Sequence, residues 1–301
     1  MVAATTAGPA RPRRRKPNPD AEGTITVGRS RTGTVLANLA GIVFSIVMIF
    51  PVYWVLNTAF KAPDEVLRFT PSFLPQHPTL ENFVSAFKAQ YFLEDLANGL
   101  VMTVSAVLGA LVVGFLAALA IARFQFYGRR AIILVVLAVQ LVPFISLLIP
   151  LFLMLQSVSL TDSLIGVSIT YVVVLLPYTV WTLRGFISGI PRELDEAAMI
   201  DGCTRAQVFW RIILPLTGPG LVATSVYGFI QAWNEFIIVN TLNSPAKQNL
   251  MAWLLQNQTT RGTAWGPLMA GAIITSIPVV IFFLIIQRNI AAGLTAGAVK
   301  G

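Results

Sequence analysis

Six long apolar blocks, separated by short polar segments, constrain this chain more than any other feature of its sequence. A helix needs about 20 consecutive apolar residues to cross a bilayer, and each block reaches that length. Because the bilayer core offers no water to backbone N–H and C=O groups, such blocks span it as helices. We predict membrane-spanning helices at Leu36–Phe60, Leu96–Ala122, Ala131–Leu155, Leu164–Phe186, Gly220–Asn240 and Gly266–Gln287.

The composition agrees with a polytopic α-helical membrane protein, which we expect to lie in the plasma membrane. Hydrophobic residues make up 55% of the chain and charged residues 11%, whereas soluble domains carry about 25% charged residues. The net charge of +8 does not indicate nucleic-acid binding, because the basic residues lie beside apolar blocks and not on a face with interleaved aromatics. The single cysteine, Cys203, excludes an internal disulfide and a thiolate metal site.

The distribution of lysine and arginine predicts which way the helices run. These residues collect in cytoplasmic loops. If the N-terminus is cytoplasmic, most of the 21 lysines and arginines fall in the inner segments. We therefore expect six spans with both termini in the cytoplasm.

Outside the spans, the sequence predicts one disordered segment and one loop that is partly helical. Residues 1–33 are rich in Pro, Arg, Gly and Thr without an apolar period, so we predict a disordered basic tail, followed by a membrane domain at 34–301. The external loop at 61–95 is irregular in its first, proline-rich half. After Thr79, apolar residues recur with helical spacing, which predicts a short amphipathic helix.

The cytoplasmic loop at 187–218 carries the most specific pattern in the chain. Pro191 suits the first turn of a helix, and Gly202 suits the left-handed position that ends one. Thr204 and Gln207 have the spacing of a capping box, which opens a second helix. The segment is therefore predicted to form helix, tight turn, helix. A passive linker between spans would not need ends specified this closely.

At these residues the chain resembles the permease subunits of ABC importers. Glu196, Ala197, Ala198 and Gly202, followed by Ile212 and Leu214-Pro215, match the "EAA" loop of that family at every defined position. Further resemblance to the maltose-type, smaller second permease of the carbohydrate branch lies in three stretches, at 177–191, 232–236 and 293–301. The resemblance covers roughly residues 36–301.

The resemblance implies the fold of a type I ABC importer permease and a set of partners. The loop would couple this chain to an ATPase subunit through Glu196, Ala197, Ala198 and Gly202, with Asp195 and Asp201 as charged neighbours. A second homologous permease would complete the pore. Two ATPase subunits would bind ATP and Mg²⁺, and an external solute-binding protein would deliver the solute. The imported solute would be a sugar or oligosaccharide.

One acidic residue lies well inside a predicted span. A charge near the bilayer centre costs roughly 2.5–3.5 kcal/mol, so Glu235 should face the bundle interior or water. It can either hydrogen-bond between helices or line the solute path together with Trp233 and Asn234. Both interpretations fit the sequence, because carbohydrates bind to carboxylates, amides and aromatic faces.

The sequence contains no G-x-x-x-x-G-K-[ST] phosphate loop and no familiar catalytic or metal-binding arrangement. We therefore expect no catalytic site, no bound metal and no cofactor on this chain. The alternatives are an ion-gradient-driven secondary transporter, with Glu235 as a proton site, and an ABC importer for a solute other than a sugar. A membrane-embedded enzyme would need reactive residues that the spans lack.

Overall fold

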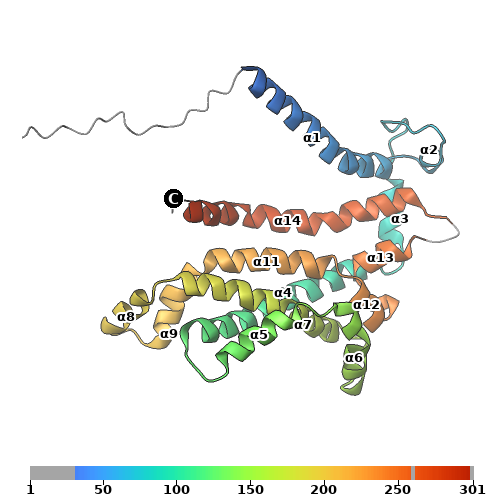
Figure 1. Ribbon diagram of the computed structural model, residues 1–301. Coiled ribbons are helices and arrows are strands. Elements are labelled where there is room, and N and C mark those ends of the chain that lie inside the picture. The colour runs from blue at the N-terminus through green and yellow to red at the C-terminus, as the bar shows by residue number, and fades with distance from the viewer. Residues whose placement is uncertain (1–30, 259–261, 299–301) are drawn as a thin grey trace, which may run out of the picture. The chain divides into compact units, whose positions relative to one another are not determined.

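The computed structural model describes residues 31–258 and 262–298, and every regular element in these ranges is a helix. The chain divides into two compact units, residues 1–51 and 52–301. The predicted tail lies outside the described residues except for 31–33, which already belong to the first helix. The helices, drawn in Figure 1, are α1 (Arg31–Ala59), α2 (Pro63–Val66), α3 (Glu81–Lys88), α4 (Phe92–Arg123), α5 (Arg129–Val139), α6 (Phe144–Ser157), α7 (Leu164–Gly189), α8 (Arg192–Ile200), α9 (Arg205–Val208), the π-helical turn η2 (Phe209–Ile213), α10 (Leu214–Leu216), α11 (Gly218–Trp233), α12 (Ile237–Leu242), the 3₁₀ turn η3 (Pro245–Lys247), α13 (Leu250–Gln256) and α14 (Trp265–Ala298).

Four of the described helices are long and apolar enough to cross a membrane, and two bent helix pairs bring the number to as many as six. The four are α1, α4, α7 and α14, which correspond to the first, second, fourth and sixth predicted spans. The bent pairs are α5 with α6, at 104°, and the α9–α10 segment with α11, at 65°. The all-helical architecture is therefore as predicted, with four to six candidate spans.

The third predicted span, Ala131–Leu155, is broken into two helices and is not continuous. The α5 helix ends at Val139 and α6 begins at Phe144. Pro143 stands at the N-cap of α6 in an extended conformation. A proline disfavours the helical conformation of the residue before it and cannot donate to the preceding turn, so the helix ends here. By contrast, Pro150 and Pro177 lie inside α6 and α7 and do not end these helices.

The fifth predicted span, Gly220–Asn240, is also shorter than expected. The α11 helix ends at Trp233, and a new helix, α12, starts at Ile237. The Glu235 carboxylate accepts hydrogen bonds from the Ile238 N–H at 2.9 and 3.1 Å. A side-chain acceptor at this position satisfies a free N–H at the start of a helix. Glu235 therefore stabilises the break instead of lying along a continuous helix.

The second unit is built around the packing of α4 against α7, which lie side by side (Figure 1). Glycines of α4 allow this close approach: a Cβ added at Gly114 would lie 2.6 Å from the Thr179 side chain, and one at Gly109 would lie 2.9 Å from Val172. Small residues at helix contacts are the usual solution in membranes. A hydrogen bond of 2.9 Å between Ser105 and Ser168 joins the same two helices.

The segment between α1 and α4 contains the predicted amphipathic helix as α3. Thr79 accepts a hydrogen bond from the Glu81 N–H at 3.1 Å. The buried Asn82 side chain donates to the carbonyls of Ala59 and Lys61 at 2.9 and 2.7 Å, which fixes α3 to the end of α1. The proline-rich half differs slightly from expectation, because Pro63 opens the short helix α2.

Candidate functional site: the α8–α9 helix pair

The first helix of the pair ends in a turn that requires glycine. After α8, the Gly202 N–H donates to the Met199 carbonyl at 3.1 Å and the Cys203 N–H donates to the Ala198 carbonyl at 2.9 Å. These two bonds form a Schellman motif. Gly202 has a φ of +89°, and a Cβ built on it would meet no atom within 4 Å. Backbone conformation, and not lack of space, therefore selects glycine at this position.

The second helix opens with the predicted capping box. The Gln207 N–H donates to Thr204 Oγ1 at 3.3 Å, and the Thr204 N–H donates to Gln207 Oε1 at 2.7 Å. The helix continues through η2 and α10 and bends into α11 near Thr217. Both helix ends were predicted from local residue types, and both are present.

An ion pair fixes α8 to the end of α4. Arg123 Nε lies 3.0 Å from Asp195 Oδ2, and the two side chains are only 8% and 15% exposed. Arg123 also donates to the Ile190 carbonyl at 3.0 Å. In the opposite direction, Arg192 donates to the Ala122 carbonyl at 3.3 Å. Asp195 thus contacts this chain itself, through a partner that no local sequence pattern indicates.

Apolar packing reinforces this attachment. Buried residues from the ends of α4 and α7 form one cluster with the α8–α9 helix pair, and Ala198 and Cys203 pack partly buried against it. Phe209 contacts Phe115 edge-to-face at 5.6 Å between ring centroids. The small size of Ala198 is therefore used inside this chain. The helix pair and the two spans behind it form one packed body.

The opposite face of the pair is exposed and partly apolar. Glu196, Ala197, Asp201 and Gly202 are exposed, as the sequence interpretation requires for a contact surface. Large apolar neighbours that no motif had indicated are exposed as well: Ile200 is 86%, Leu194 44% and Met199 43% exposed. We call Leu194, Ala197 and Ile200, which recur every three residues of α8, the apolar ridge. The sequence signal for this surface was a large apolar residue, Ile200, at the end of a helix rich in charged residues.

The three residues suggested for the solute path occupy different environments. Trp233 is 4% exposed, and its indole N–H donates to the Thr275 carbonyl of α14 at 3.1 Å. Glu235 accepts from the Tyr171 hydroxyl of α7 at 3.2 Å in addition to the Ile238 N–H. Asn234 is exposed, and its side chain donates to the Ile230 carbonyl at 2.9 Å. Only Asn234 of the three presents an exposed polar side chain.

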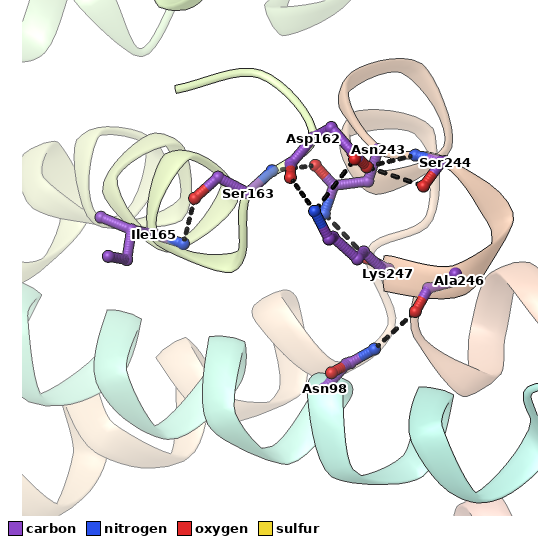
Figure 2. Close-up of polar contacts among 8 residues, drawn as sticks. All are labelled: Asn98, Asp162, Ser163, Ile165, Asn243, Ser244, Ala246 and Lys247. Carbon is purple, nitrogen blue, oxygen red and sulfur yellow. Dashed lines mark hydrogen bonds and ion pairs between the residues drawn. The ribbon is translucent and has the colours of Figure 1, made fainter. Parts of the chain in front are cut away.

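A polar cluster that no sequence motif indicated joins the turn before α7 to the segment after α12 (Figure 2). The Asp162 carboxylate accepts from the Ser244 N–H at 2.9 Å and from its hydroxyl at 2.7 Å. Lys247 Nζ lies 3.0 Å from Asp162 Oδ2 and donates to the Asp162 carbonyl at 2.7 Å. These hydrogen bonds and the lysine charge lower the pKa of Asp162 to about 2. Asn243 adds a bond from the Ser163 N–H at 3.1 Å.

Among residues 31–258 and 262–298, no group of three or more His, Cys, Asp or Glu residues is placed to hold a metal ion. Cys203 is a free thiol, partly buried beside the turn of the helix pair. Apart from the helix pair, the described residues form mainly long apolar helices.

Comparison with known proteins identifies the class to which this arrangement belongs. Residues 110–296 match the family model described as binding-protein-dependent transport system inner membrane component. The chain belongs to this family of transport permeases, and the matched range includes the whole α8–α9 helix pair.

Two relatives and one solved structure show how far the similarity extends. The chain is 42% identical over 274 residues to the diacetylchitobiose uptake system permease protein DasC of Streptomyces coelicolor, covering 91% of this chain and 99% of that protein. It is 36% identical to the trehalose transport system permease protein SugB of Mycobacterium tuberculosis, covering 84% and 93%. A bacterial ABC transporter that imports alginate has a similar fold, with a TM-score of 0.74 at 21% identity over 86% of this chain and 98% of that one.

Proposed function

We propose that this chain is a permease subunit of an ATP-driven importer that moves a sugar or oligosaccharide into the cell. The observation that supports this proposal most strongly is the α8–α9 helix pair. Its helix ends are capped, it packs onto two spans, and its outer face is exposed. Relatives named for diacetylchitobiose and trehalose transport support the sugar as solute. The chain would work with a second permease, two ATPase subunits that use ATP and Mg²⁺, and an external solute-binding protein.

The attachment of the helix pair suggests how force reaches the membrane. The Arg123–Asp195 ion pair and the apolar cluster join α8 to the ends of α4 and α7. A push on the exposed face of α8 would therefore move these spans with it. Such rigid-body movement would carry the bundle between inward-open and outward-open states during alternating access. The exposed Asn234 would lie on the solute path.

We also propose six spans with both termini in the cytoplasm. Two fully exposed aromatic residues allow a direct test: Phe69 in the external loop and Tyr127 in the loop after α4. In a Cys203→Ser background, an impermeant thiol reagent should label Phe69→Cys in intact cells. It should label Tyr127→Cys only after the cells are opened. The opposite labelling pattern would reject this orientation.

The proposed transport is tested with the purified complex in liposomes. Uptake of maltose, trehalose and diacetylchitobiose would be measured with ATP inside, with a non-hydrolysable analogue inside, and with an imposed proton or sodium gradient. The proposal expects uptake of at least one sugar only with hydrolysable ATP. Uptake driven by the ion gradient would favour a secondary transporter, and ATP-driven uptake limited to solutes other than sugars would refute the sugar assignment.

A further inference from the structure

A cavity lies among the helices, and the sequence analysis did not assign its lining residues to the solute path. A cavity of about 530 Å³ opens beside the break between α5 and α6 and is bordered by α7 and α11. Ligand pockets in proteins commonly have volumes of about 300–1,000 Å³. Four polar or amphipathic side chains line it among apolar neighbours: Gln140, Tyr178, Tyr227 and Gln231.

These four side chains come from three helical segments and retain unused hydrogen-bonding capacity. The rings of Tyr178 and Tyr227 stack with centroids 3.7 Å apart. The Gln231 amide donates to the Tyr227 hydroxyl at 3.4 Å, and the Gln140 amide reaches the Val136 carbonyl of its own helix at 3.5 Å. Both contacts are long for hydrogen bonds. An amide group has two donors and a carbonyl acceptor, so both glutamines can bind a further polar partner.

At the depth of the cavity, these amides need a polar partner from another helix, from water or from a ligand. At a rise of about 1.5 Å per residue, Tyr178 lies roughly 21 Å from the start of α7 and roughly 16 Å from its end. The hydrocarbon core of a bilayer is about 30 Å thick, so Tyr178 lies near its middle. Amides at this depth are costly when they face lipid and normally face another helix, water or a ligand.

We propose that this cavity is a contact site for the sugar and that it selects uncharged saccharides. This inference rests on the proposed sugar import. Amide and phenol groups suit sugar hydroxyls, and the tyrosine rings suit the apolar faces of the pyranose. No Lys, Arg, His, Asp or Glu lines the cavity. An acidic sugar would therefore enter it without a compensating cation, at a high desolvation cost. Asn234 lies on the same helix end, three residues beyond Gln231.

The first test asks whether the cavity holds water and solute. In the purified complex with its solute-binding protein and a Cys203→Ser background, a hydrophilic thiol reagent should label Gln231→Cys. Maltose, trehalose or diacetylchitobiose, whichever is transported, should slow this labelling. Labelling of the exposed Phe69→Cys should be unaffected by sugar. Absence of labelling at residue 231 would show that lipid or a partner helix fills the cavity, which overturns the proposal.

The second test asks whether the glutamine contributes to transport. Gln231→Leu should lower the maximal rate of neutral sugar uptake by roughly tenfold, the effect of about one lost hydrogen bond, while basal ATP hydrolysis persists. The control is Gln287→Leu, because Gln287 is exposed on α14 and does not line the cavity. Equal uptake by both variants would reject the site. If wild-type protein transports no sugar, the proposed function itself fails.

Selectivity provides the third readout. Wild-type complex should transport neutral disaccharides and not an alginate trisaccharide, whereas Gln231→Arg should reduce neutral uptake and leave the complex assembled. Uptake of the acidic trisaccharide by the wild type at a rate comparable with that of neutral sugars would refute the selectivity for uncharged saccharides.

Discussion

Arg123 at the end of α4 and Asp195 in α8 form a largely buried ion pair, with 3.0 Å between Nε and Oδ2. Removal of one partner leaves the other charge buried without compensation. Asp195→Ala should therefore destabilise the attachment of α8 by on the order of 3 kcal/mol. We expect reduced sugar uptake per ATP hydrolysed, because α8 would move without carrying the spans with it.

The exchanged pair distinguishes this role from a direct contact with the ATPase. Arg123→Asp combined with Asp195→Arg should recover part of the uptake per ATP that either single variant loses. The measurement is the ratio of uptake to hydrolysis in liposomes. If Asp195 instead bound the ATPase directly, the exchanged pair would be as defective as Asp195→Arg alone.

Substitutions at Gly202 test the turn between α8 and α9. Gly202→Ala should cost about 1–2 kcal/mol, because a side chain disfavours the left-handed conformation, even though the added Cβ meets no atom within 4 Å. Gly202→Asn should be milder. The matched control is Gly189→Ala, where the glycine also has free space but does not have a positive φ. Equal melting temperatures for the two alanine variants would contradict the assignment.

Two variants of Glu235 distinguish a role as helix cap from a role in contacting the solute. Glu235→Gln keeps an acceptor for the Ile238 N–H, so we expect almost unchanged thermal stability and uptake. Glu235→Ala removes the cap of α12 and should lower stability by about 1 kcal/mol. The measurements are the melting temperature of the complex and uptake across several sugars. A changed sugar preference in the Gln variant would return this residue to the solute path.

The Asp162 cluster predicts a pH dependence with a defined sign. The folded-state pKa of Asp162 is lowered from 3.8 to about 2, so its ionised form stabilises the fold. This contribution is complete above about pH 4 and is lost as the pH falls toward 2. Asp162→Asn should lower the melting temperature at pH 7, and the difference from wild type should shrink as the pH falls from about 4 to about 3.

The exposed pair of Asp64 and Arg68 in the external loop supplies the control for this measurement. Exposed ion pairs contribute little to stability, and the Asp162–Lys247 pair is itself about half exposed. The larger effect expected for Asp162 comes from its hydrogen bonds with Ser244. Asp64→Asn should therefore shift the melting temperature at pH 7 less than Asp162→Asn does. A difference between Asp162→Asn and wild type that grew on acidification would show that the sign is wrong.

Features set by neighbouring residues could be predicted from the sequence. The Schellman turn at Gly202 and the capping box of Thr204 with Gln207 depend on residue types within a few positions of each other. The long spans follow from apolar length alone. Pro143 itself was a local signal for the break in the third span, but the prediction relied on the length of the apolar block.

Features set by residues distant in the chain could not be predicted. Asp195 was expected to contact the ATPase subunit, because its actual partner, Arg123, lies far away in the sequence at the end of α4. Glu235 seemed to belong to a continuous helix because its capping bond to Ile238 appears only once α11 has ended. The cavity between α5, α7 and α11 brings together glutamines and tyrosines that share no sequence motif.

The central claim is that the exposed face of α8 docks onto an ATPase subunit, and crosslinking tests it most directly. In the assembled complex with Cys203→Ser, a short photoactivatable crosslinker attached at Ala197→Cys, on the apolar ridge, should join this chain to the ATPase subunit. The yield should change between nucleotide-free and ATP-bound states. The same crosslinker at the external Phe69→Cys should give no such product. Absence of the ATPase crosslink from Ala197→Cys in an intact, transporting complex would contradict the account.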